Sequence, residues 1–252
     1  MPHAYGYLPD RPDPADFSFQ AVRPPTAPLP PSVDLRHLCS PVRDQGQLGS
    51  CTGFAIAVGM REFLQVKLGV NLVTMSPLFL YYEERVRENS VGEDAGAMPR
   101  DGFKVLQKIG CSPEKDWPYA IKKFTKAPSK KALQDALAFK IAAYHRLAGP
   151  IDMQACLAEG NGFVMGFSVY ESFESDAVAK TGKMPMPSPG EKVLGGHAVF
   201  CAGYQTDSKA AGGGWFIIKN SWGAGWGDGG YFYMPFAFVT PDNVSDAWTA
   251  VV

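Results

Sequence analysis

Residues 44–55 read Asp44-Gln45-Gly46-Gln47-Leu48-Gly49-Ser50-Cys51-Thr52-Gly53-Phe54-Ala55 and place a cysteine directly before an amphipathic helical pattern. A thiol at the N-terminus of a helix lies at the positive end of the helix dipole, which favours the thiolate over the thiol. The glutamine just upstream can donate an amide hydrogen bond to charge that develops on a carbonyl oxygen. Gln45 and Cys51 therefore predict half of an acyl-transfer site, an oxyanion donor and a nucleophile.

Such a site also needs a base and a group that orients the base, and both occur far downstream. The base candidate is His197 in the stretch 195–199, and the orienting candidate is Asn220, which is followed by Ser221, Trp222 and Gly223. Imidazole titrates near neutral pH, so this histidine can take a proton from the thiol and later return it to a leaving amine. We expect Trp222 to shield the histidine–asparagine hydrogen bond, and the resting pair to be thiolate and imidazolium.

These blocks, in this order, resemble the papain-like cysteine peptidases. Gln45, Cys51, His197 and Asn220 match that family's oxyanion glutamine, nucleophile, base and orienting asparagine, and the Cys51–His197 spacing falls within the family's window of about 130–150 residues. The likeness runs from about Ser32 to the C-terminus and is strongest with the bacterial, xylellain-like branch. It implies a cysteine endopeptidase of α+β class, with a helical left lobe, an antiparallel β-barrel-like right lobe and the active-site cleft between them.

Each residue also has a simpler interpretation when it is taken alone. Cys51 would be a small buried hydrophobe, His197 a core histidine and Asn220 a turn residue. Two other functions stay open beside the peptidase. One is a different Cys–His acyl-transfer enzyme, such as an amidase, deamidase or acyltransferase, and the other is a non-catalytic, peptide-binding relative.

The resemblance further implies a pocket for the substrate side chain that lies two residues before the scissile bond. The substrate-binding residues it indicates are Gly96, Ala97, Met98, Phe167, Gly196 and Trp222, with Pro99, Gly195 and Ala198 beside them. Because this set contains no acid, we expect an apolar side chain in the pocket. For Met98 and Phe167 the alternative is ordinary core packing.

Composition narrows the partners to a polypeptide substrate. The 252 residues are 46% hydrophobic, enough for one compact two-lobed unit, and the net charge of −1 without a basic stripe argues against nucleic acid and anionic membranes. We expect a monomer without a cofactor, and without a metal because no Cys/His spacing of the zinc type occurs. We expect Cys39, Cys111, Cys156 and Cys201 to be free thiols. No transmembrane stretch or secretory signal is readable, so the compartment stays open between the cytoplasm and export by a non-classical route.

The first 31 residues differ in kind from the remainder of the chain. They contain nine prolines, which exclude a regular helix and favour an extended backbone. They also contain Tyr5, Tyr7, Phe17 and Phe19, aromatic anchors that a solvated linker does not need. We therefore expect residues 1–31 to be a short inhibitory prosegment in or beside the cleft of a peptidase domain spanning residues 32–252. The alternative is a disordered tail.

Hydrophobic periodicity changes from helical to strand-like along the peptidase domain. It predicts helices at 51–68, 76–86, 100–109 and 151–159, and strands at 163–170, 197–204, 214–220 and 230–234. Gly69 is the expected C-cap of the first helix, and Ser76 is the expected N-cap of the second. Helices followed by strands indicate an α+β architecture.

Overall fold

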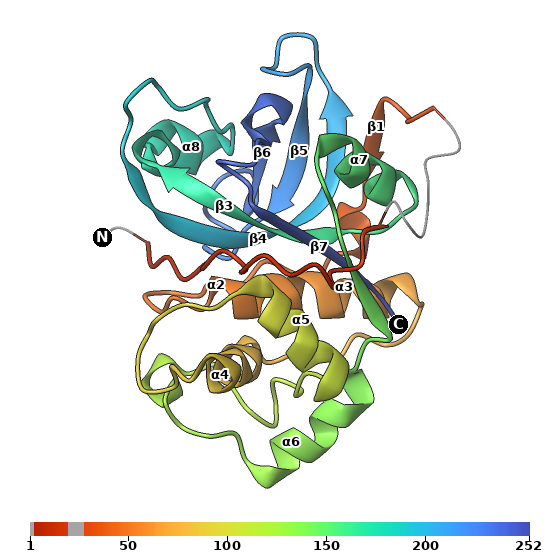
Figure 1. Cartoon of the computed structure of the whole chain (residues 1–252), viewed down its shortest axis with the longest axis vertical. Coiled ribbons are helices and arrows are strands. Elements are labelled where there is room, and N and C mark those ends of the chain that lie inside the picture. Colours follow the sequence, from red (N-terminus) through yellow and green to blue (C-terminus); the bar gives the residue numbers. More distant parts are fainter. Residues whose placement is uncertain (1–2, 20–27) are drawn as a thin grey trace.

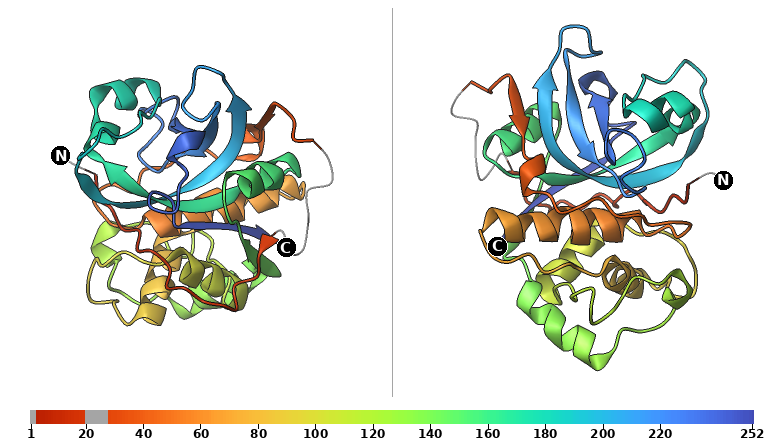
Figure 2. Two further views of the ribbon diagram at one scale, coloured as in Figure 1. Left: turned by 45° about the horizontal axis from the view of Figure 1, so that its top comes forward. Right: turned by 180° about the vertical axis from the view of Figure 1, so that it is seen from behind.

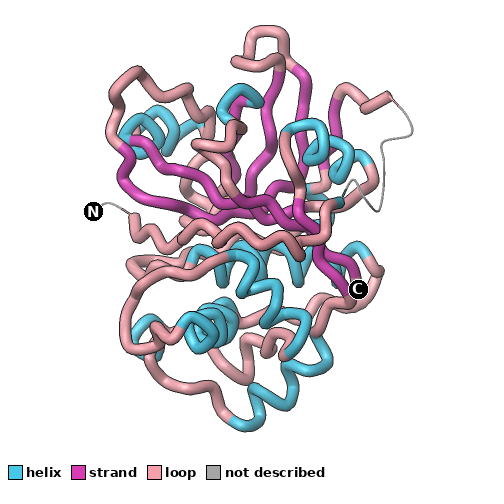
Figure 3. Tube along the Cα trace, viewed as in Figure 1, coloured by secondary structure: helices cyan, strands magenta, loops and turns pink. Residues whose placement is uncertain are grey.

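The computed structural model describes residues 3–19 and 28–252 and shows two lobes with an extended N-terminal segment between them (Figure 1). The remaining residues of the proline-rich stretch, 1–2 and 20–27, lie outside the described part of the chain. Seen from behind, the helix that begins at Cys51 lies along the boundary between the lobes (Figure 2). Helices dominate one lobe and strands the other, as Figure 3 shows by colour. The predicted α+β class is confirmed.

The central helix consists of three consecutive stretches: α2 (Cys51–Gly53), the π-helical η2 (Phe54–Arg61) and α3 (Glu62–Lys67). Residues 51–65 are all buried because a lobe covers the helix on either side. The helix ends at Lys67, and Gly69 follows the cap residue Leu68 with a φ of 70°, which suits the glycine predicted at this helix end. The π-helical middle was not predicted, because a wider turn leaves no signature in hydrophobic periodicity.

The other helices are short and well delimited. In the helical lobe, the Ser76 side chain caps α4 by accepting the Phe79 N–H at 3.1 Å, as predicted. The helices outside the central one are α4 (Pro77–Glu88), α5 (Pro99–Lys108), α6 (Lys130–Ala136), α7 (Pro150–Ala158) and α8 (Asp176–Thr181). Short 3-10 turns lie at Arg36–Leu38, Ile121–Lys123, Leu137–Phe139, Glu171–Glu174 and Phe236–Phe238.

The second lobe is built on one antiparallel sheet of seven strands. They are β1 (Ser32–Asp34), β2 (Ala143–Arg146), β3 (Phe163–Tyr170), β4 (Val193–Thr206), β5 (Gly214–Lys219), β6 (Tyr231–Pro235) and β7 (Asp246–Val251). The order is β2-β7-β3-β4-β5-β6, with β1 paired to β4, so the sheet does not close into a true barrel. The four predicted strands are present, whereas β1, β2 and β7 were not predicted. At Gly59 the sheet approaches the central helix so closely that a Cβ would lie 2.5 Å from the Phe200 Cβ.

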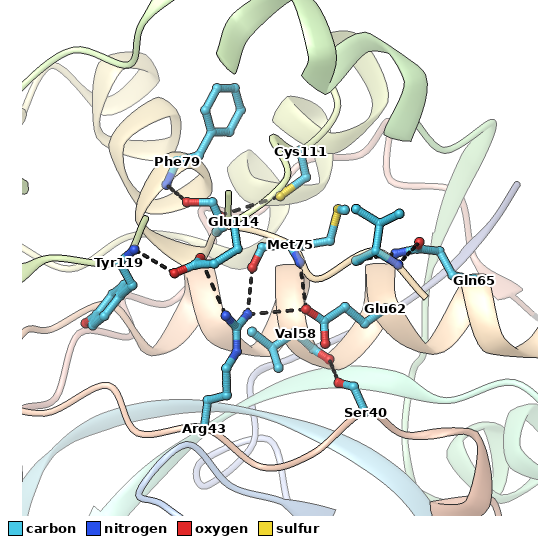
Figure 4. A network of polar contacts seen from close by, with 12 residues as sticks. Ser40, Arg43, Val58, Glu62, Gln65, Met75, Phe79, Cys111, Glu114 and Tyr119 are labelled. Carbon is cyan, nitrogen blue, oxygen red and sulfur yellow. Dashed lines mark hydrogen bonds and ion pairs between the residues drawn. The ribbon is translucent and has the colours of Figure 1, made fainter. Parts of the chain in front are cut away.

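A partly buried polar network holds the loop that leads into the central helix (Figure 4). Arg43 forms ion pairs with Glu62 of α3 at 3.3 Å and with Glu114 at 3.5 Å. Glu114 accepts the Tyr119 N–H at 2.7 Å, and the Tyr119 hydroxyl donates to the Gln45 carbonyl oxygen at 2.7 Å. Glu62 is buried, and a buried carboxylate needs a charged partner, so Arg43 is held in place. The bond from Tyr119 to the Gln45 carbonyl oxygen then links this network to the backbone of Gln45.

Candidate active site

Cys51 is the first residue of α2 and is completely buried. Its sulfur takes part in hydrogen bonds with the backbone amides of Ala198 on β4 and of Gly6 in the N-terminal segment. Ala198 directly follows His197, so the start of the central helix meets the strand that carries the base candidate. The two lobes thus bring together residues that are far apart in sequence.

His197 lies in β4, and its Nε2 is 2.8 Å from Asn220 Oδ1 just beyond β5. An amide oxygen only accepts, so Nε2 carries the hydrogen of the neutral ring and Nδ1 is left as the basic nitrogen. Nδ1 is buried and has no hydrogen-bond partner among the described residues. The second hydrogen bond to Asn220 Oδ1, from the Ser221 N–H at 2.8 Å, fixes the asparagine in turn.

Trp222 covers the histidine ring. The two rings stack with centroids 4.9 Å apart and an interplanar angle of 26°. Trp226 packs edge-on against Trp222, also at 4.9 Å. The indole therefore shields the His197–Asn220 bond from water, as expected from the sequence.

Gln45 is completely buried and its amide is oriented at both ends. Its Oε1 accepts the Ser221 hydroxyl at 2.6 Å, which turns Nε2 toward the carbonyl oxygens of Leu48 at 3.0 Å and Ala4 at 3.1 Å. The glutamine predicted to stabilise an oxyanion thus already donates to a carbonyl oxygen of the N-terminal segment.

The N-terminal segment crosses these groups as extended backbone. Tyr7 N–H donates to Gly196 O at 3.0 Å, and Ala97 N–H donates to Gly6 O at 2.8 Å. Tyr7 and Ala97 form a parallel bridge. The passage at Gly6 is narrow, because a Cβ there would lie 1.7 Å from Gly49 O. Residues 4–8 therefore pair with both walls of the cleft.

Aromatic side chains of the segment add to this pairing. His3 stacks on Trp222 with ring centroids 3.7 Å apart and places its Nδ1 3.0 Å from the Glu174 carboxylate. The Tyr5 ring meets His197 edge-on at 6.3 Å. Tyr7 and Phe19 are buried, whereas Phe17 is 74% exposed, so the predicted anchoring by Phe17 is wrong.

Burial under this segment changes the charges of the catalytic candidates. Burial raises the pKa of the Cys51 thiol to about 11, although backbone hydrogen bonds from Ala198 and Gly6 favour the thiolate. Burial also lowers the pKa of His197 to about 4, although the hydrogen bond to Asn220 opposes this shift. The covered pair is therefore neutral at pH 7 instead of thiolate and imidazolium, because an ion pair without water is costly.

The predicted substrate-binding residues fall into two groups. Gly96, Ala97 and Gly196 lie against the segment backbone, Trp222 contacts His3, and Met98 immediately precedes α5. Phe167 is fully buried and packs against the His197 ring at 5.8 Å. Successive strand residues face opposite sides of a sheet, and it is the neighbouring Gly166 that faces Tyr7.

The sequence interpretation missed an acid that the fold brings to this region. The Tyr7 hydroxyl donates to Asp246 Oδ2 at 2.5 Å, and Asp246 is the first residue of the unpredicted strand β7. Pairing of Gly166 with Asp246 places it beside the pocket. The sequence analysis could have found Asp246 only by predicting β7 and its pairing with β3.

Three further observations concern metal ligands, thiols and membrane-spanning helices in the described part of the chain. Residues 3–19 and 28–252 contain no group of three or more His, Cys, Asp or Glu that could hold a metal ion. All five cysteines lie in the described ranges and are free thiols. No helix within those ranges has the length and apolar character needed to cross a membrane.

Comparison with known proteins agrees with this geometry. Residues 29–239 match the family model described as "Papain family cysteine protease". Xylellain, a cysteine protease from Xylella fastidiosa, superposes with a TM-score of 0.88 at 39% identity, covering 99% of this chain and 96% of that one.

Two curated relatives extend the comparison. A peptidase C1-like protein of Acanthamoeba polyphaga mimivirus is 37% identical over 97% of this chain and 85% of its own length. Cysteine proteinase 3 of Entamoeba histolytica is 28% identical over 81% of this chain, which spans 62% of that protein's length. With the match to the family model, these likenesses show that the chain belongs to the papain family of cysteine proteases.

Proposed function

We propose that the chain is an endopeptidase with Cys51 as nucleophile, His197 as base and acid, Asn220 as the group that orients His197, and Gln45 in the oxyanion hole. We also propose that residues 1–31 are a prosegment that keeps the peptidase domain, residues 32–252, inactive. The contacts at Ala4 and Gly6 carry this proposal, because the segment occupies the oxyanion donor and the nucleophile at once.

In the open enzyme, His197 Nδ1 takes the thiol proton and the Cys51 sulfur attacks the substrate carbonyl carbon. The oxygen becomes an anion that accepts hydrogen bonds from Gln45 Nε2 and from the Cys51 backbone N–H. As the C–N bond breaks, His197 returns its proton to the leaving amine and a thioester remains. Water, deprotonated by the same nitrogen, then attacks the thioester and releases the carboxylic acid and the thiol.

The segment resists cleavage because its register is wrong for attack. Ala4 presents its carbonyl oxygen to Gln45 Nε2 at 3.1 Å, whereas the sulfur of Cys51 is hydrogen-bonded by the backbone amide of Gly6, two residues further along the segment. A hydrogen bond to the sulfur and burial of the pair both disfavour the nucleophilic thiolate. The tether keeps the segment at a local concentration near millimolar, so weak contacts suffice to close the site.

The test compares the full chain with a chain that starts at Ser32, using a fluorogenic peptide and labelling by a thiol-directed epoxide. We expect faster hydrolysis and faster labelling of the shortened chain. Equal activity would reject the prosegment, and absence of labelling would favour a non-catalytic relative. Transfer to an added acyl acceptor in place of hydrolysis would favour an acyltransferase.

Gln45→Ala should lower kcat roughly 100- to 1,000-fold with little change in KM, because its hydrogen bond strengthens as the oxyanion forms. Gln47→Ala is the matched control, since Gln47 lies exposed in the same loop. Steady-state kinetics of the shortened chain, normalised by epoxide titration, give the result. An unchanged kcat in Gln45→Ala would contradict the proposed role of Gln45 as a donor in the oxyanion hole.

His197→Ala should be nearly as damaging as loss of the nucleophile, because general acid–base transfer contributes about 10²–10⁴ in rate. Asn220→Ala should cost less, since asparagine orients the ring and transfers no proton. The same kinetics compare the two variants with the parent. A larger loss in Asn220→Ala than in His197→Ala would contradict the assigned roles.

Closure by the segment should weaken as the pH rises from 5 to 8. Burial, and then the charge of Asp246, raise the pKa of Asp10 to about 7, against hydrogen bonds from Arg100 N–H and Trp248 Nε1. A free aspartate titrates near 4, so the docked segment takes up a proton below about pH 7. The stabilisation is full below about pH 4, declines as the pH rises and is lost above about 7.

Asp10→Asn mimics the protonated carboxyl, so it should close the cleft more firmly at pH 8 and about equally at pH 5. The measurement is the ratio of wild-type to Asp10→Asn epoxide-labelling rates at each pH, which cancels the pH dependence of the catalytic groups. A ratio that is flat from pH 5 to 8 would contradict this linkage.

A further inference from the structure

Tyr7 of the N-terminal segment lies in a slot that is built from both lobes, and the slot is shaped for a flat ring. A Cβ on Gly166 of β3 would come within 2.0 Å of the Tyr7 ring, and a Cβ on Gly196 of β4 within 2.6 Å. The Tyr7–Ala97 bridge closes the slot from the helical lobe. Two residues without side chains thus leave the space that the ring occupies. We call this slot, formed by Ala97, Gly166, Gly196, Ser245 and Asp246, the Tyr7 pocket.

The floor of the Tyr7 pocket is a buried carboxylate. Asp246 is 1% exposed, and its Oδ2 accepts hydrogen bonds from the Tyr7 hydroxyl, from Asp10 N–H at 2.9 Å and from Ser245 Oγ at 3.2 Å. When the segment leaves, Tyr7 and Asp10 leave with it, and only the Ser245 bond to Oδ2 remains. In the empty pocket, Asp246 Oδ2 can therefore accept a hydrogen bond from the hydroxyl of a tyrosine that binds where Tyr7 was.

The other carboxylate oxygen of Asp246, Oδ1, forms an ion pair with the side chain of Arg146. Arg146 Nη2 lies 3.2 Å from Asp246 Oδ1, and Arg146 Nη1 lies 3.0 Å from Asp16 of the segment. Departure of the segment removes Asp16 from Arg146, and it also removes Asp13 and Asp16 from Arg100. The open floor becomes more positive, which disfavours a lysine or arginine side chain in the pocket.

We propose that Asp246 is a specificity-determining residue that makes the open enzyme prefer tyrosine in the Tyr7 pocket over phenylalanine and over basic residues. This inference rests on the proposed function, and it takes the pocket to be the one that reads the side chain two residues before the scissile bond. A phenylalanine would bury Oδ2 with the Ser245 hydroxyl as its one remaining donor from the pocket and would replace neither of the two donors that the segment supplied. Sites built around a hydroxyl reject the analogue that lacks it because a buried acceptor is then left under-satisfied. The sequence led us to expect an apolar substrate side chain in this pocket. The proposal replaces it with tyrosine, which has an apolar ring and a polar hydroxyl.

The test uses the full chain with Gly6→Val, whose added side chain overlaps Gly49 O and expels the segment. Its substrates are acetyl-X-Arg-methylcoumarin amides, with X as Tyr, Phe, Leu or Arg, and kcat/KM is expressed per epoxide-titrated site. We expect Tyr to exceed Phe and Arg at least ten-fold. In Gly6→Val with Asp246→Leu the Tyr/Phe ratio should fall to about 1, while the Phe/Leu ratio, which involves no hydroxyl, is the internal control.

Asp246→Asn, which keeps the size and polarity of the side chain, provides the same comparison if the leucine variant does not fold. Its Tyr/Phe ratio should also fall, since a neutral amide is a weaker acceptor than a carboxylate. A Tyr/Phe ratio near 1 in Gly6→Val, an unchanged ratio in both Asp246 variants, or a preference for Arg would overturn the inference. Failure of all four peptides together with absent labelling would instead reject the proposed function.

The same hydrogen bond can be tested from the side of the segment. Tyr7→Phe in the otherwise unchanged full chain removes only the hydroxyl that meets Asp246. We expect epoxide labelling to speed up about ten-fold or more, because a hydrogen bond to a charged group is lost. Labelling at the wild-type rate would show that the floor of the pocket does not recognise this hydroxyl and would overturn the inference.

Discussion

Gly6→Val is expected to raise the peptidase activity of the full chain at least ten-fold. The Cβ of any residue other than glycine at this position would lie 1.7 Å from Gly49 O and 2.4 Å from Gly49 C. These are backbone atoms of the loop before the central helix. Asp94 fixes this loop, because its Oδ2 accepts the Gly49 N–H at 3.0 Å, and a shift of Gly49 would break that hydrogen bond. The segment must shift instead. The hydrogen bond from Ala97 N–H to Gly6 O is then lost, and so is the hydrogen bond from the Gly6 backbone amide to the Cys51 sulfur.

The measurement for Gly6→Val is the initial rate of fluorogenic peptide hydrolysis together with the rate of epoxide labelling. Ala15→Val is the matched control, because it adds a comparable side chain at an exposed position of the same segment. Wild-type rates in Gly6→Val, with a fully titratable thiol, would mean that residues 4–8 do not limit access to the site. An equal gain in Ala15→Val would point to general destabilisation of the segment.

Cys51→Ala, introduced into the Gly6→Val chain, should abolish peptide hydrolysis while the fold is retained. The sulfur is the only atom assigned to form the thioester, so no second group can carry the acyl transfer. The side chain is small and completely buried, and its loss leaves little cavity. Thermal unfolding followed by circular dichroism should show a midpoint within a few degrees of the parent.

Retention of even a tenth of the parental turnover in Cys51→Ala would contradict the mechanism. Ser50→Ala is the control for an alternative nucleophile, because Ser50 carries the neighbouring hydroxyl. Its Oγ is hydrogen-bonded to the Tyr119 hydroxyl at 2.7 Å. The Ser50→Ala variant should keep the Cys51-dependent reaction. A loss confined to Ser50→Ala would move the nucleophile by one residue.

The proposed inhibited state accounts for the strongly shifted pKa values of Cys51 and His197. Their pKa values favour a neutral thiol and a neutral imidazole while the segment covers them. Removing the segment readmits water and charged-state solvation, which is the condition under which a thiolate–imidazolium pair forms. The prosegment would thus act on the chemistry as well as on access.

Local sequence alone predicted the parts of the protein that depend on short stretches of chain. Cys51 at a helix start, the Ser76 cap and Gly69 beyond the central helix are determined by backbone hydrogen bonds and conformations that only a few neighbouring residues control. His197 and Asn220 were identified because their motifs and order resemble those of the family. The four strands that were predicted are the ones with clear alternation or long apolar runs.

Tertiary structure decided what depends on contacts between distant segments. Strand β7 was not predicted, and only its pairing with β3 brings Asp246 beneath Tyr7. A one-residue alternation in β3 decides that Gly166 faces the pocket while Phe167 supports His197. The segment fits at Gly6 because its backbone approaches the backbones of Gly49 and Gly96 closely, and these two residues are distant from it in sequence. Periodicity indicates which residues are buried, but it carries no information about which distant residue packs against them. The candidate catalytic residues could be identified from their motifs, whereas Asp246 has no motif and reaches the pocket floor only through the pairing of β7 with β3.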